Sequence, residues 1–532
     1  MKKLIYTVSL FLLLTTLFSS CEKSLEEKYN NPDKTAGADI PGFFTAMLNN
    51  DRVRPSYWNV RTFLLMQPAL YSQTAYFGNS NGAYKQNDSY VQQYWEDFYT
   101  SGGNGSGSMA MYRAMETAYA SLPDAQKTDR EIFMQAAKVV LYDQTSQMVD
   151  LWGDIPFSET GSLETSSTII NARFDDQVEV YNTLLSGLDE AATYFATATS
   201  TATFAKYDIL SKGNVSKWQR YANSIRLRLL MRISNVNETT ARTEVLKMLS
   251  NASQYPLIDG DNTGDYNPVN SDVLLMPLTN NTASLNSALT ELPSHYAPDY
   301  MLNTVMLGSN DPRMPVMFDK FGITVGSAFI PNPTYRAMPI TFTSEEQEAN
   351  FSSYSILDSA TFLGNPSLPG IVITASEVNF LKSEAYLRWG SDAEAKVAYE
   401  NAVKQSISFY YYLNNLNTTG VKTETKPVTS VILDFVTTSN IAYSGNSSDK
   451  LAKIMTQKWL HFGFLQSTQA WSEYRRTGYP SLTFPATGKL AGFTTSPTRL
   501  LYPSSERTNN IDNYQNVAAK DTRTAKIFWD VN

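Results

Sequence analysis

The feature that most constrains this chain is the segment ending at Cys21, the only cysteine in the sequence. Lys2 and Lys3 precede fifteen residues without a charge, Leu4–Phe18, and two serines then place small side chains directly before the cysteine. A basic start, an apolar run and a small-residue junction are typical of an export signal. The run is also shorter than the roughly twenty residues that span a bilayer. The sequence therefore predicts an export signal over residues 1–20.

The residues before Cys21 resemble a bacterial lipoprotein signal, in which the cysteine is acylated and becomes the mature N-terminus. Phe18 departs from the leucine that is usual three places before the cysteine. The alternative is a plain secretory signal followed by a free thiol. On the lipoprotein interpretation Cys21 carries the lipid, attachment to the membrane is by that anchor alone, and the polar residues 21–39 form a tether.

Composition limits the classes of fold and partner. A single cysteine cannot form a disulfide within the chain, so stability must come from a large core, for which 532 residues are ample. The 51 acidic side chains outnumber the 43 basic ones, and the predicted signal would remove two of the lysines. This balance disfavours nucleic acid, whose binding depends on Lys and Arg. We predict a single domain over 40–532.

Helical periodicity recurs along that domain. In 129–152 the apolar residues form one stripe, with Thr128 or Asp129 as the expected N-cap and Gly153 as the stop. A second helix is predicted around 218–229, with basic residues largely off its apolar face, and a third over 451–462. The second helix takes its stripe from Trp218, Tyr221, Ala222, Ile225 and Leu229, and its basic residues are Lys217, Arg220 and Arg228.

Residues 375–410 have the spacing of a tetratricopeptide helix pair, interrupted at Gly390. An ordinary helical hairpin is the alternative. Because one pair cannot bury its own apolar face, we expect partners at 107–152 and 174–234. The predicted fold is mainly α, a tetratricopeptide-like solenoid of helical pairs. Its long irregular loops are expected to form a binding face, and they span 99–108, 196–214, 259–300, 308–370 and 414–448.

Few residues support catalysis or metal binding. The two histidines are His295 and His461, and His461 lies in a predicted helix beside aromatic residues, where packing or capping is expected. No triad or zinc cluster can be assembled from the sequence, and the glycine-rich run 102–107 lacks the strand and lysine of a phosphate loop. Asp259, Asp261 and Asp265 lie in a segment that mimics the first half of a calcium loop. Its alternative is a solvated acidic loop, since Asn270 stands where a glutamate is needed.

Several motifs, taken in order, resemble the SusD/RagB family of nutrient-binding outer-membrane lipoproteins, in its SusD-like branch. They are the lipoprotein start with Glu22, Asn31-Pro32, Trp95 with Tyr99, the segment 150–157, Lys217-Trp218 through Arg228, Ser376 through Tyr386, Gln457-Lys458-Trp459, Arg475 through Pro480, and Arg499 with Tyr502-Pro503, Glu506 and Asn510. The resemblance implies four tetratricopeptide-like pairs and no enzymatic activity or cofactor. It also implies that the segments 152–157 and 475–478 are scaffold.

The same resemblance implies a protein on the cell surface above a SusC-like TonB-dependent outer-membrane barrel, capturing oligosaccharides or, in some members, peptides. Sugar rings have apolar faces and polar edges, so a binder needs exposed aromatic rings beside hydrogen-bonding groups. By their place in the loops we predict a ligand site at Tyr76, Tyr84, Tyr296, Tyr335 and Arg336, with Tyr300 nearby. The alternatives are that these rings only pack the loops, or that the protein is a surface glycoside hydrolase or an adhesin.

Overall fold

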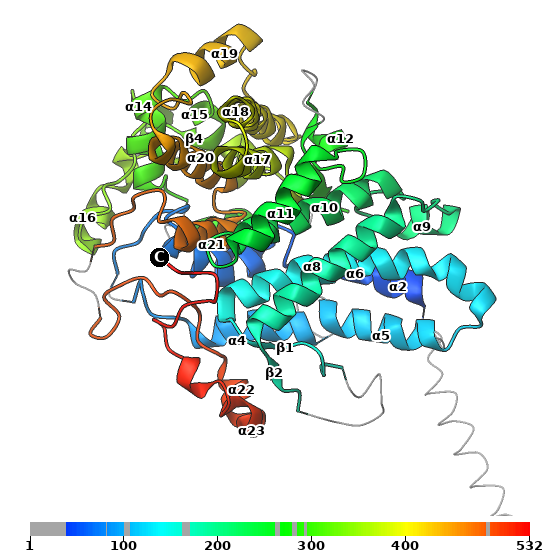
Figure 1. Ribbon diagram of the computed structural model, residues 1–532. Helices are drawn as coiled ribbons and strands as arrows, with labels where there is room; N and C mark the ends of the chain where they lie inside the picture. The colour runs from blue at the N-terminus through cyan, green and yellow to red at the C-terminus, as the bar shows by residue number, and fades with distance from the viewer. Residues whose placement is uncertain are drawn as a thin grey trace, which may run out of the picture.

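Pairs of antiparallel helices form most of the structure, and irregular segments gather beside them (Figure 1). The structure is a computed structural model. It describes residues 39–532 apart from 81, 101–106, 162–170, 261–265, 279–284, 292–294 and 486–489. The predicted signal, Cys21 and residues 22–38 of the tether lie outside the described residues, as does most of the glycine-rich run.

The helices of the first half are α2 (Ile40–Leu48), η1 (Trp58–Leu64), α3 (Pro68–Tyr71), α4 (Asp88–Tyr99), α5 (Ser108–Ala120), α6 (Asp124–Trp152), α8 (Gln177–Phe195), α9 (Ala202–Tyr207), α10 (Val215–Arg232), α11 (Glu238–Ser250) and α12 (Pro268–Ser271). Those of the second half are α13 (Leu285–Thr290), η3 (Tyr300–Met306), α14 (Leu307–Ser309), α15 (Met314–Met317), α16 (Ser344–Ala349), η4 (Phe351–Ser353), η5 (Ser359–Leu363), α17 (Ala375–Trp389), α18 (Asp392–Asn415), α19 (Thr429–Thr438), α20 (Ser447–Phe462), α21 (Ser467–Thr477), α22 (Ser504–Asn509), α23 (Ile511–Tyr514) and η6 (Ala518–Lys520).

The predicted helical pairs are confirmed. The predicted pair at 375–410 is α17 with α18, which turn at Gly390, and the expected partners are α5 with α6 and α8 with α10. A further pair is α20 with α21. Tyr399 of α18 is fully buried and its ring packs against Phe380 of α17, which is the contact expected of the large aromatic in such a pair. The family-like spacing therefore reports real helix–helix contacts.

Helix α6 ends as predicted but begins earlier. Gly153 stops it with a positive φ of 82°, a conformation that glycine adopts without strain. The predicted start at Thr128 or Asp129 is wrong, because the helix begins at Asp124 directly after Pro123. The first turns of α6 are solvent-exposed, so they lack the apolar stripe from which the start of the helix was predicted. The negative charge of Asp124 in the first turn interacts favourably with the positive end of the helix dipole.

A buried charge cluster joins the pairs. Arg476 of α21 binds both carboxylate oxygens of Glu384 in α17 at 2.7 Å, and it also binds Glu473. Glu473 in turn pairs with Arg232 of α10 at 2.7 Å and with Lys458 of α20. The charges come from α10, α17 and the consecutive helices α20 and α21, so the cluster joins three helical pairs and fixes how they pack.

Helix α10 corrects one sequence prediction. Its apolar stripe is buried as expected, but Arg228 is buried as well instead of lying off the packed face towards solvent. Its guanidinium binds Glu377 of α17 at 2.6 and 2.8 Å and Asp143 of α6 at 3.1 Å. A cation can be buried when it is paired and hydrogen-bonded, so α10 is packed on both faces.

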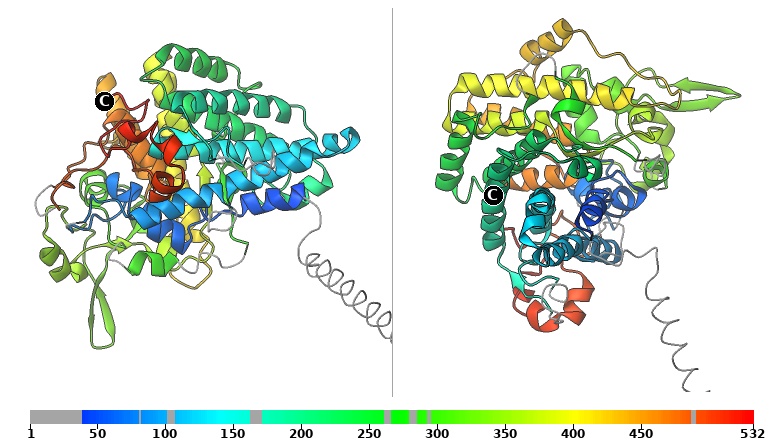
Figure 2. Two further views of the ribbon diagram at one scale, coloured as in Figure 1. Left: turned by 90° about the horizontal axis from the view of Figure 1, so that it is seen from below. Right: turned by 90° about the vertical axis from the view of Figure 1, so that its right-hand side faces the viewer.

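The long loops carry short elements of their own. Antiparallel two-stranded ladders join β1 (Ile155–Pro156) to β2 (Phe174–Asp175), β3 (Val273–Leu275) to β8 (Gly370–Ile373), β4 (Phe318–Asp319) to β7 (Ile356–Leu357), and β5 (Gly322–Val325) to β6 (Ala328–Pro331). The β5–β6 hairpin projects from the body, as the light-green arrows at the lower edge of the left view in Figure 2 show. Across the described part of the chain, no helix combines the length and apolar composition needed to cross a bilayer.

Candidate functional site

Two of the predicted loops, 259–300 and 308–370, meet the segment around Tyr76 in a small core of their own. Tyr76, Tyr296, Met338 and Ile356 form a buried cluster separate from the main core of the helices. Phe321, Phe342, Phe351, Tyr354 and Leu363 pack around it and are partly exposed. We call the surface of residues 320–357 over this cluster the loop face. It includes α16, at the left edge of Figure 1.

Three of the predicted ligand residues are buried within the loops. Tyr76, Tyr84 and Tyr296 are 8%, 1% and 5% exposed. The rings of Tyr76 and Tyr296 lie 5.6 Å apart, and the Tyr84 hydroxyl donates to the carbonyl of Pro485 at 3.0 Å. Burial raises the pKa of Tyr296 to about 12. The prediction that these three form an exposed platform is therefore wrong, because irregular loops without a sheet or helix to cover them use their own rings as a core.

The other two predicted residues remain at the surface. Tyr335 is half-buried, with the Lys320 ammonium 5.1 Å from its ring centre. Arg336 is exposed, lies 5.2 Å from the ring centre of Tyr354, and donates a hydrogen bond to the carbonyl of Ser353. Of the five predicted ligand residues, only Tyr335 and Arg336 therefore reach the surface of the loop face.

Several rings of the loop face were not singled out from the sequence. Phe351 stacks on Tyr296 with ring centres 4.7 Å apart and planes 17° apart. Phe342 and Tyr354 pair edge to face at 6.2 Å, and Phe329 on the projecting hairpin is 54% exposed. The available signal was the density of aromatic residues between 321 and 354, which marks a loop that packs on itself.

Hydrogen bonds hold the loop face in place. Gln347 of α16 donates to the carbonyl of Phe77 at 3.1 Å and accepts from the amide of Asn79 at 2.9 Å. Asn79 also donates to the carbonyl of Phe342 at 2.6 Å. These bonds fasten residues 77–79 to 342–347 across a large sequence separation, so the aromatic surface is preorganised and loses little entropy on binding.

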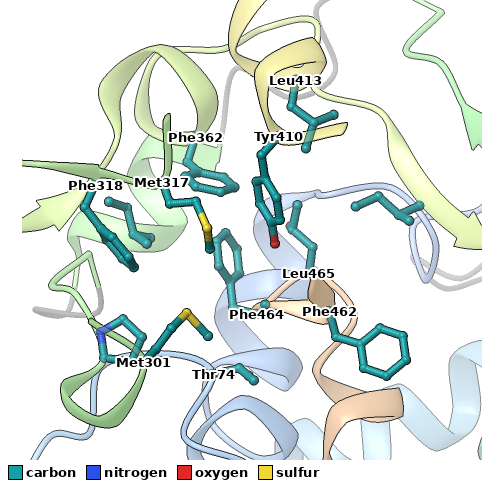
Figure 3. A pocket seen from close by; sticks show the side chains of 14 residues that line it. Thr74, Met301, Met317, Phe318, Phe362, Tyr410, Leu413, Phe462, Phe464 and Leu465 are labelled. Carbon is teal, nitrogen blue, oxygen red and sulfur yellow. The ribbon is translucent and has the colours of Figure 1, made fainter. Parts of the chain in front are cut away.

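An apolar pocket lies between the loops and the helices. Its volume is about 10 Å³, and Figure 3 shows Met301, Met317, Phe362 and Phe464 converging on it. A space of this size holds no more than a single water molecule. The pocket is therefore a packing gap and cannot receive a nutrient.

The predicted calcium loop has little to offer a cation. The Asp259 carboxylate pairs with the Lys382 ammonium at 2.7 Å, which neutralises its charge, and Asp261 and Asp265 lie outside the described residues. Among the residues that the structure does describe, no three His, Cys, Asp or Glu side chains are grouped to hold a metal ion.

The titratable groups with perturbed pKa values serve the scaffold. His461 is buried between Thr374 at 2.7 Å and Ser406 at 3.0 Å, and burial lowers its pKa to about 3. This confirms a packing role. Burial also raises the pKa values of Asp272 and Asp358 to about 7, but Asp272 accepts hydrogen bonds from Tyr266 and Ala375, and Asp358 from Thr361 and Asn414.

Most residues of the two segments that the resemblance assigns to the scaffold are buried. Asp150 and Trp152 at the end of α6 are buried, and Asp150 accepts from the Trp529 indole at 2.8 Å. Arg475 donates to the Asp150 carbonyl at 2.9 Å, while Arg476 lies in the charge cluster. These contacts hold helices together, as expected of a scaffold role.

Known proteins share this fold. A SusD-like family model, described as starch-binding and associating with the outer membrane, matches residues 42–503. A solved chitin-binding protein is 22% identical with a TM-score of 0.73, covering 93% of this chain and 100% of its own. A chitin-binding SusD homologue from Flavobacterium johnsoniae is 23% identical with a TM-score of 0.69, and the match covers 93% of this chain and 99% of the homologue.

A SusD homologue from Bacteroides thetaiotaomicron is 20% identical with a TM-score of 0.68, covering 93% of this chain and 99% of its own. No curated protein matches the chain. The structural likenesses show the fold, and the family model spans both the paired helices and the loop face. The chain therefore belongs to the SusD-like family.

Proposed function

We propose that the protein captures a neutral oligosaccharide on its loop face and releases it unchanged. The observation that carries this proposal is the preorganised aromatic surface in which Phe351 lies on Tyr296 and Tyr354 lies beside Arg336. The description of the family as starch-binding and the chitin-binding relatives support a carbohydrate ligand.

The loop face offers the two kinds of contact that a sugar needs. One face of the Phe351 ring is covered by Tyr296, and the other can stack on the apolar C–H face of a pyranose. The Arg336 guanidinium carries several N–H donors at the surface, and hydroxyl groups of a sugar can accept from them. Tyr335 stays a proposed contact of the same site.

Calorimetric titration against a panel of oligosaccharides and peptides tests the site. Stacking on an aromatic ring is worth about 1–3 kcal/mol in the comparable case of nucleic-acid bases, so Phe351→Ala should weaken binding about five- to 150-fold. Arg336→Ala should also weaken it, whereas Arg242→Ala, at an exposed arginine of α11, should not. Unchanged affinity in both loop-face variants would place the site elsewhere, and preference for peptides would make the protein a peptide-binding member.

Glycoside hydrolysis is the alternative that must be separated from binding. Asp272 and Asp358, whose pKa values burial raises to about 7, are buried and already hydrogen-bonded. We therefore expect no new reducing ends when purified protein is incubated with glycans that it binds. Hydrolysis that one Asp or Glu substitution abolishes would make the protein an enzyme.

We further propose that Cys21 is lipidated, that the protein faces the exterior of the outer membrane, and that it delivers its ligand to a SusC-like TonB-dependent barrel. The exposed apolar residues of the β5–β6 hairpin, Ile323 and Ile330, suit a surface that a partner protein covers. Protease added to intact cells should digest the protein, and mild solubilisation should recover it with a barrel. Protection from protease would contradict the exterior location, and recovery of the protein always alone would contradict the partnership.

A further inference from the structure

A second cleft, whose lining includes none of the loop-face rings, lies between η3, the segment 440–445 and α20. Its volume is about 550 Å³, within the range of small-molecule sites. Tyr300 and Thr304 form one wall, Asn440 and Ser444 the second, and Lys453 and Gln457 the third. All of these residues belong to the described part of the chain.

Gln457 brings a buried donor to this cleft. Its side chain is 1% exposed, and its Oε1 accepts from Arg313 at 2.6 Å. Arginine can only donate, so this bond fixes which end of the amide faces Arg313. The Nε2 group then has no hydrogen-bond partner among the described residues. Buried donors are normally satisfied, and leaving one without a partner costs about 1–3 kcal/mol, so an acceptor from a ligand would complete it.

Tyr300 gives the cleft an aromatic wall. Its ring is half-buried and packs edge to face against Trp459, with ring centres 6.0 Å apart. Trp459 is itself fixed, because its indole N–H donates to the carbonyl of Ser72 at 2.7 Å. Tyr300 therefore packs against a fixed neighbour, and an aromatic ring supported in this way can stack on a sugar.

The part of the lining that comes from Lys453, Ser444 and Asn440 is also fixed. The Lys453 ammonium donates to the carbonyls of Ala442 at 2.8 Å and Ser444 at 3.1 Å, and to the Ser444 hydroxyl at 3.0 Å. These three bonds use all the donors of the ammonium. Asn440 donates to the carbonyl of Gly308 at 3.0 Å. The Asp449 carboxylate also lines the cleft, and its Oδ2 accepts from the backbone amide of Asn446 at 3.0 Å in the capping box of α20. Because the Lys453 charge is already used and the other charge in the lining is a carboxylate, the cleft disfavours an anionic ligand and suits a neutral one.

We propose that this cleft is a second glycan-binding site, in which a pyranose ring stacks on Tyr300 and one of its oxygens accepts from Gln457 Nε2. The ligand class rests on the proposed function, while the location and the contacting residues do not. A chain bearing two sites would hold a long glycan at two points, and the resulting avidity would favour polymers over short fragments.

Calorimetry with neutral trisaccharides of several linkages, chitotriose and maltotriose among them, tests the proposal. Wild-type protein should bind two equivalents. Gln457→Glu keeps the acceptor for Arg313 but removes the donor, and Thr304→Trp fills the cleft, so each should leave one equivalent. Tyr300→Ala should weaken the second site about five- to 150-fold, whereas the matched Tyr300→Phe should bind as wild type does.

The loop-face variants separate this inference from the proposed function. Phe351→Ala should weaken one equivalent and leave the cleft intact. One equivalent in the wild type that Gln457→Glu and Thr304→Trp do not change would overturn the cleft while leaving the proposed function standing. Absence of binding to every trisaccharide by folded wild-type protein would overturn both, and binding of a peptide in the cleft would overturn its ligand class.

Discussion

Replacing Tyr399 by alanine should cost the protein a large part of its stability. The side chain is 0% exposed, and its ring packs against Phe380 at 6.2 Å and Tyr443 at 5.7 Å. Truncating a buried aromatic ring costs about 3–5 kcal/mol, out of a total stability of about 5–15 kcal/mol. The hydroxyl donates to the carbonyl of Ile441 at 2.6 Å, so its loss adds an unpaired buried carbonyl.

A matched series separates these contributions. Tyr399→Phe keeps the ring and removes only the hydrogen bond, so it should cost about 1 kcal/mol. Glu394→Gln, at an exposed position of the same helix, should change stability by less than about 0.5 kcal/mol. Urea unfolding followed by tryptophan fluorescence gives the midpoints from which the free energies are compared. Equal losses for Tyr399→Ala and Glu394→Gln would mean that the faces of α18 are misassigned.

Three further predictions concern charge and attachment. Glu384→Gln should destabilise the protein by about 3–5 kcal/mol in urea unfolding, because it leaves Arg476 and Lys458 to share Glu473. Below pH 6.5 the wild type should lose stability relative to His461→Gln by about 1.4 kcal/mol per pH unit. The reason is that His461 takes up a proton at about pH 6.5 in the unfolded chain, whereas burial lowers its pKa in the folded protein to about 3. A parallel pH dependence of the two proteins would refute this. Cys21→Ala should fold normally but leave the membrane fraction on centrifugation, and its retention there would contradict the anchor.

The helical frame was predictable because burial imposes a periodicity that the sequence must carry. The stripe of α6 and the pair at 375–410 are local patterns, and Gly153 and Gly390 mark their ends within a few residues. Burial of Arg228 was not predictable in this way. A charged residue is interpreted as solvent-exposed unless its partners are known, and Glu377 lies 149 positions away.

The candidate sites were less predictable for the same reason. Tyr76 and Tyr296 bury each other's rings through a tertiary contact that no local sequence pattern predicts. The second cleft depends on Gln457, whose donor is available only because Arg313 fixes the other end of its amide. Sequence position located the loops that contribute these rings, but which side of each ring meets solvent is a property of the assembled structure.

The bond between Tyr84 and Pro485 joins residues 401 positions apart and has a consequence for folding kinetics. Closing so long a loop loses chain entropy before any contact compensates, so distant contacts form slowly, whereas helical pairs with local contacts form fast. We expect a refolding chain to recover its helical circular dichroism first and to recover ligand affinity later. Competence to bind would then be the last property that the folding chain acquires.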